Sequence, residues 1–95
     1  MFVNHWNGYK LIWSVLAIRD LNGVERKYVI RIKNKLENLV AGHQNLDIKK
    51  LVGFKKSRYR LRVGSYRIVF EVCDDQIIII IIEVKPRDKV YKGRK

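Results

Sequence analysis

Arginine recurs at every second position in the stretch RYRLRV, residues 58–63. Alternate residues of a β-strand point to the same face, so Arg58, Arg60 and Arg62 are expected on one face with apolar residues behind them. Arg67 follows a Gly-Ser turn signal and is expected on the same face of the next strand. Guanidinium groups hold phosphate oxygens through paired hydrogen bonds, so this spacing predicts a phosphate-binding or RNA-binding face.

The C-terminal stretch VKPRDKVYK continues this chemistry. It carries four more cations, which are Lys85, Arg87, Lys89 and Lys92. Tyr91 offers a ring that can stack on a base and a hydroxyl that can handle a proton. The alternative is a charged strand face that is only solvated.

The net charge points the same way. The chain has 95 residues with 21 Lys and Arg against 9 Asp and Glu, which gives a formal charge of +12 at pH 7. An excess of this size on a small body favours a polyanionic partner, such as nucleic acid or an acidic protein.

Metal and thiol chemistry find little support in the sequence. Cys73 is the single cysteine, so it forms no internal disulfide and makes no Cys-rich zinc site. His5 and His43 lie outside the arginine pattern, and Glu71 is essentially the one carboxylate on the arginine face. We therefore expect no metal, no small-molecule cofactor and a cytoplasmic location.

Hydrophobic periodicity supplies the elements that must position these side chains. After a loose leader over residues 1–8, we expect a strand over 9–13 and a short helix that Ser14 caps and Asn22-Gly23 ends. A longer helix over 24–41 has apolar residues at three- and four-residue steps, and Gly42 stops it. Residues 43–57 are expected to form a connection, and the last three strands are 58–63, 66–72 and 77–82.

The order of these elements predicts one α+β domain over residues 1–95. Its sheet is expected to be small and antiparallel, with the N-terminal strand joined to a C-terminal three-strand meander and two N-terminal helices packed on one face.

Six consecutive isoleucines, Ile77 to Ile82, form the last strand. The run is too short to span a membrane, which takes about 20 apolar residues, and Glu83 ends it. A two-residue turn at Asp74-Asp75 would pair Val72 with Ile77 and place Ile77, Ile79 and Ile81 in the core. Ile78, Ile80 and Ile82 would then lie on the arginine face. There, either the C-terminal tail covers them or Ile78 and Ile80 form an apolar floor for a protein partner.

The stretch RYRLRVGSYRIVFEV, followed by a turn, an aliphatic strand and VKPRDKVYK, resembles the C-terminal half of the RelE/ParE toxin superfamily. The opening YKLIWS and the two helices are similar to its N-terminal half, so the resemblance covers about residues 9–91. These are small basic toxins of bacterial and archaeal toxin–antitoxin pairs.

The resemblance implies a ribosome-dependent mRNA endonuclease of the RelE branch, which uses the RNA 2′-hydroxyl as nucleophile and no metal. By position, Arg60, Arg62, Arg67, Arg87 and Tyr91 match the family's catalytic residues. We expect Arg58, Lys85, Lys89 and Lys92 to bind RNA beside them. Some relatives have lysine at one or both of the positions of Arg60 and Arg62, so the general base in this chain stays open.

The resemblance also implies partners, namely a cognate antitoxin protein, the ribosome and mRNA. The short isoleucine run already led us to expect no membrane. Two alternatives stay open. A ParE-like toxin on the same fold would inhibit DNA gyrase by protein contact, and a non-catalytic basic module would only bind RNA.

Overall fold

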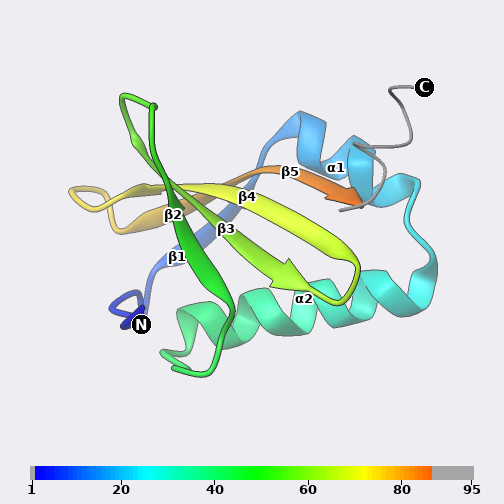
Figure 1. Cartoon of the computed structure of the whole chain (residues 1–95), viewed down its shortest axis with the longest axis horizontal. Coiled ribbons are helices and arrows are strands. Elements are labelled where there is room, and N and C mark those ends of the chain that lie inside the picture. The colour runs from blue at the N-terminus through cyan, green and yellow to red at the C-terminus, as the bar shows by residue number, and fades with distance from the viewer. Residues whose placement is uncertain (1, 87–95) are drawn as a thin grey trace.

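The computed structural model describes residues 2–86, and Figure 1 shows a twisted sheet with two helices. In chain order the elements are β1 (Lys10–Trp13), α1 (Val15–Asn22), α2 (Arg26–Val40), β2 (Ile48–Leu51), β3 (Ser57–Val63), β4 (Tyr66–Cys73) and β5 (Ile78–Pro86). The predicted α+β fold with two N-terminal helices is confirmed. No helix in the described part is long and apolar enough to cross a membrane.

The sheet has five strands in the order β1-β5-β4-β3-β2, and it is mixed. β1 runs parallel to β5, with Leu11 opposite Ile79, while the other neighbours are antiparallel. The expectation of an antiparallel sheet was therefore wrong for β1. Alternation within a strand shows which residues share a face, and it carries no information about strand direction.

β2 is a strand that the sequence did not predict, because residues 43–57 were expected to form a connection. It pairs with β3, with Lys49 opposite Arg60 and Leu51 opposite Arg58. Apolar and polar residues do not alternate in its sequence, IKKL, so no strand pattern was visible there. The segment is a strand because its backbone pairs with β3.

A serine cap begins α1, and a glycine turn follows α2. The Ser14 Oγ accepts a hydrogen bond from the Ala17 N–H at 3.0 Å and donates to the Ile82 carbonyl at 3.0 Å, so it caps α1 and ties it to β5. After α2 the chain turns at Gly42, whose φ of +83° suits glycine.

The core lies between the helices and one face of the sheet. On α2, Ile32, Leu36 and Leu39 are fully buried, and they pack with sheet residues such as Phe70 and Ile81. Burying one such Leu or Ile side chain contributes about 1.5–3 kcal/mol. Within residues 2–86, the opposite face of the sheet carries no helix, and we call it the open face.

The leader, predicted to be loose, is packed against the core. Trp6 is 5% exposed and meets Phe70 edge-on, with ring centroids 5.3 Å apart. The buried Asn4 side chain donates from Nδ2 to the carbonyls of Leu39 and His43, at 2.9 and 2.8 Å. Trp6 and Asn4 are not part of a periodic apolar pattern, so the sequence did not predict these contacts.

The isoleucine strand is offset by two residues from the predicted pairing. Val72 lies opposite Ile79 and Phe70 opposite Ile81, so residues 74–77 form the turn. Ile77 is therefore 54% exposed at φ +57°, and its expected place in the core was wrong. An offset of two preserves the face of each residue, so Ile79 and Ile81 are fully buried as predicted.

Candidate nucleic-acid interface

Three cations from three neighbouring strands lie side by side on the open face. In the strand register, Arg62 of β3 is opposite Arg67 of β4, and Arg67 is opposite Lys85 of β5. Neighbouring strands are about 4.8 Å apart, so this cationic row is a compact positive surface of the size of one or two phosphates.

Arg67 is at the centre of the row. Its Nε is buried, and it has no hydrogen-bond partner among residues 2–86. A buried donor normally has a partner, so this N–H is a donor that an anionic ligand could satisfy. The centre of the cationic row therefore holds a guanidinium whose Nε is without a hydrogen-bond partner within residues 2–86.

Arg60 and Arg62 share one carboxylate. Their Nη1 atoms lie 3.5 and 3.6 Å from the two carboxylate oxygens of Asp47, just before β2. The Arg60 side chain is only 12% exposed, whereas Arg62 is more open. The structure therefore brings Arg62 and Arg67 together, and it keeps Arg60 largely covered.

The remaining predicted RNA-binding residues in the described part are held by carboxylates as well. Arg58 Nε donates to Glu71 Oε2 at 3.0 Å, which also occupies Glu71. Lys85 Nζ donates to Asp20 Oδ1 at 3.0 Å, and the Val84 N–H donates to Oδ2 of the same carboxylate at 2.9 Å. Asp20 thus joins α1 to β5 beside the cationic row.

The four tail residues of the predicted site, Arg87, Lys89, Tyr91 and Lys92, lie outside the described residues. β5 ends at Pro86, one residue after Lys85. Within residues 2–86, no group of three His, Cys, Asp or Glu side chains is placed to hold a metal ion. His5 and His43 are exposed, and neither belongs to a strand of the row.

A pocket of about 460 Å³ opens on the same face. Its lining combines basic, apolar and aromatic side chains: Lys49, Lys50, Leu51, Val52, Phe54, Arg58, Arg67, Val69, Ile82 and Glu83. The sequence pattern did not single out Phe54, Lys49 or Lys50, because they belong to a segment expected to be a plain connection. The signal that could have identified this segment is an aromatic residue, Phe54, within the basic stretch KKLVGFKK, a combination typical of nucleic-acid binding.

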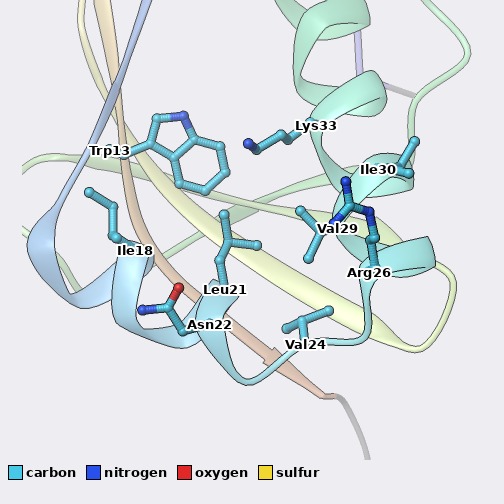
Figure 2. A pocket seen from close by; sticks show the side chains of 9 residues that line it. All are labelled: Trp13, Ile18, Leu21, Asn22, Val24, Arg26, Val29, Ile30 and Lys33. Carbon is cyan, nitrogen blue, oxygen red and sulfur yellow. The ribbon is translucent and has the colours of Figure 1, made fainter.

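A second hollow, of about 680 Å³, lies on the helix side of the sheet between α1 and α2, and we call it the helix groove. Figure 2 shows Trp13, Leu21 and Val29 around it, with the cations Arg26 and Lys33 at its border. Its other lining residues are Ile18, Asn22, Val24 and Ile30. Ile18 and Ile30 are exposed, so this groove presents apolar surface to solvent.

Comparison with known families gives one match over most of the chain. Residues 11–91 match the family described as the ParE toxin of the type II toxin-antitoxin system parDE.

Comparison with individual proteins gives archaeal relatives. The chain is 37% identical to toxin RelE3 of Methanocaldococcus jannaschii over 73 residues, which are 73% of this chain and 82% of that protein. It is similar to the solved RelB-RelE antitoxin-toxin complex from Methanococcus jannaschii, with 32% identity, a TM-score of 0.67 and coverage of 88% and 99%. It also resembles the archaeal RelE-RelB complex from Pyrococcus horikoshii OT3, with a TM-score of 0.72 and coverage of 84% and 96%. The identity in that case is 24%, which supports the shared fold alone.

Proposed function

We infer the function of this chain from its membership of a family: it belongs to the RelE/ParE superfamily, as a type II toxin–antitoxin toxin of the RelE family. Its proposed activity is cleavage of mRNA on the ribosome, which inhibits translation. The observation that carries this proposal is the cationic row, with Arg67 at its centre and an unpartnered Nε.

The proposed chemistry builds negative charge on the oxygens around the phosphorus. The 2′-hydroxyl of the RNA gives its proton to a base, and its oxygen bonds to the adjacent phosphorus to form a 2′,3′-cyclic phosphate. The bond to the 5′-oxygen of the next nucleotide breaks, and that oxygen takes up a proton. Cations fixed in advance around the pentacoordinate phosphate stabilise this charge. Arg67 and Arg62 take that role, and Arg60 supports them from the more covered position beside Asp47.

The proton transfers need groups besides arginine, which stays charged. Glu71, on the open face, is engaged by Arg58. In this proposal the tail supplies Arg87 and Tyr91, with Tyr91 orienting or stacking on the substrate base. The ribosome contributes by holding the mRNA in a reactive geometry, which can supply much of the rate.

Alanine at Arg67 tests the proposal. We expect Arg67→Ala to lower cleavage of ribosome-bound mRNA by about 10²- to 10³-fold, the loss typical of removing one charge-stabilising donor. Primer extension on mRNA from a reconstituted translation reaction measures it. Lys35→Ala removes one exposed cation from α2, away from the row, and should cleave normally. Full activity in folded Arg67→Ala would show that the site is assigned wrongly.

The matched family is itself described as the ParE toxin, so gyrase inhibition is the second candidate activity. In that reading the chain contacts gyrase as a protein and leaves RNA intact. Inhibition of supercoiling by purified gyrase, without mRNA cleavage, would decide for it. Salt-sensitive RNA binding without a growth defect would instead favour a non-catalytic RNA-binding module.

The proposed protein partner is an antitoxin. Two similar solved structures are toxin–antitoxin complexes, and the helix groove offers this chain a site for an amphipathic segment. Its apolar lining suits the apolar side of such a segment, and Arg26 and Lys33 suit acidic residues at its edge (Figure 2). The affinity of the antitoxin for variants of the groove residue Ile30 measures this.

A further inference from the structure

Phe54 is a large apolar side chain in an unusual place. It lies in the connection between β2 and β3, which projects beyond the sheet in Figure 1, and it is 50% exposed. The preceding Gly53 has φ +91°, a left-handed conformation that turns the chain just before the ring. Packing within the chain leaves half of this aromatic residue open to solvent.

The Phe54 ring lies against Arg58, which Glu71 holds in place. The Arg58 guanidinium carbon lies 4.6 Å from the centre of the Phe54 ring, within the range of a cation–π contact. The same guanidinium donates to Glu71 on the neighbouring strand at 3.0 Å, which fixes its position. One face of the ring is therefore covered by an anchored cation, and the exposed half of the residue remains for a second stacking partner.

The pocket joins this ring to the cationic row. Phe54 and Arg58 line it together with Arg67, the central residue of the row, and its apolar lining includes the buried Val69. Four cations and one carboxylate, Glu83, contribute to the lining. A flat apolar ring beside cations is a combination that binds single-stranded nucleic acids, because bases stack on aromatic faces while phosphates pair with the cations.

We propose that Phe54, backed by Arg58, is a stacking platform for one base of the mRNA, next to the phosphate that Arg67 contacts. This inference rests on the proposed mRNA cleavage and adds to it a substrate-binding residue outside the residues matched to the family. Stacking is tolerant of base identity, so the platform holds the RNA strand in register and discriminates only modestly between bases.

The test combines variants of Phe54 with altered RNA. Removing an aromatic platform costs about 5- to 150-fold per base, so Phe54→Ala should lower kcat/KM for ribosome-bound mRNA by a factor in that range. Phe54→Trp should restore activity, whereas Phe54→Leu, which keeps apolar bulk without a ring, should not. Abasic sites are then moved through the codon and its neighbours. Removing the base that stacks on Phe54 should slow cleavage by the unsubstituted protein. The same abasic RNA should not slow cleavage by Phe54→Ala any further, because that variant has already lost the stacking contact.

Binding measured apart from cleavage separates this inference from the proposed function. A single-stranded RNA oligonucleotide with 2-aminopurine reports stacking by its fluorescence. If the protein cleaves no mRNA but quenches this probe through Phe54, the cleavage proposal fails and the platform stands. Normal cleavage by Phe54→Ala would contradict the stacking role of Phe54. Equal activity of Phe54→Leu and Phe54→Trp would contradict it as well. Loss of antitoxin affinity with cleavage unchanged would also overturn it, by showing a protein-binding surface.

Discussion

Arg67 differs from its neighbours in what holds it. Among the described residues, Arg58, Arg60, Arg62 and Lys85 each lie within 4.0 Å of a carboxylate oxygen, whereas the buried Nε of Arg67 has no hydrogen-bond partner. In three of these four ion pairs one side chain is only 11–13% exposed, so the carboxylates hold the cations in fixed positions. Among these five described cations, Arg67 is thus the one whose Nε is buried without a hydrogen-bond partner.

Tyr9 gives a pH-dependent prediction at the scale of one residue. Its hydroxyl donates to Asp74 Oδ1 at 2.7 Å and ties the residue before β1 to the turn between β4 and β5. That hydrogen bond is the main cause that raises the pKa of Tyr9 above its ordinary value of 10.0, with smaller contributions from desolvation and the Asp74 charge.

Because the pKa is raised in the folded protein, the stabilisation is complete below pH 10 and disappears as the pH rises through the raised pKa. Tyr9→Phe should therefore lower Tm at pH 7 to 9, and the difference from the unsubstituted protein should shrink at higher pH. Thermal unfolding across this pH range measures it. A difference that stays constant at high pH would show that ionisation of the Tyr9 hydroxyl does not control this stabilisation.

At the scale of elements, β5 holds the sheet together. It is hydrogen-bonded to β1 on one side and to β4 on the other, and α1 contacts it through Ser14 and Asp20. An irregularity in its pairing at Val69/Phe70 shifts the register, so Ile81 and Val84, three residues apart, both reach the core. This shift allows Lys85, rather than a core residue, to lie beside Arg67.

Asp20 is expected to stabilise the contact between α1 and β5. Its carboxylate accepts from the Val84 N–H and from Lys85 Nζ, and its side chain is largely buried. Asp20→Ala leaves the Val84 donor unpaired, so we expect it to lower the free energy of unfolding by about 1–3 kcal/mol. Asp20→Asn keeps an acceptor for Val84 and should cost less. Urea unfolding of the three proteins measures this, and an alanine variant as stable as the unsubstituted protein would contradict it.

At the scale of the whole molecule, the two candidate surfaces lie on opposite sides of the sheet. The cationic row and its pocket are on the open face. The helix groove is on the side that carries α1 and α2, whose residues line it in Figure 2. An antitoxin segment in the groove and RNA on the open face would therefore use different side chains. This makes their effects separable by mutation.

Ile30 tests that separation. It is 53% exposed in the helix groove, so Ile30→Asp should change stability by only about 0.5 kcal/mol. We expect it to weaken antitoxin binding by about 30-fold, as a hot-spot residue would, because it removes apolar contact and adds a charge that repels an acidic partner. Isothermal titration with the cognate antitoxin measures the affinity, and mRNA cleavage should be retained.

Ile77→Asp is the matched control, since Ile77 is equally exposed in the turn between β4 and β5 and does not line the groove. Equal losses of affinity in the two variants, or none in Ile30→Asp, would place the antitoxin elsewhere.

The sequence by itself determined what depends on local periodicity. Alternation in residues 58–63 put Arg60 and Arg62 on the face away from the core, and the steps of Ile32, Leu36 and Leu39 identified the buried side of α2. The Ser14 cap and the Gly42 stop are local as well, because each depends on side-chain or backbone chemistry within a few residues.

Features that depend on partners far along the chain could not be predicted without the three-dimensional structure. Strand direction in β1, the existence of β2 and the two-residue offset of the isoleucine strand are set by pairing between segments that are distant in sequence or by the length of a turn. The leader became ordered because Trp6 and Asn4 meet core and helix groups over 30 residues away. The same physics brought Phe54 to Arg58 and Arg67, since a pocket forms where several strands meet and no single stretch encodes it.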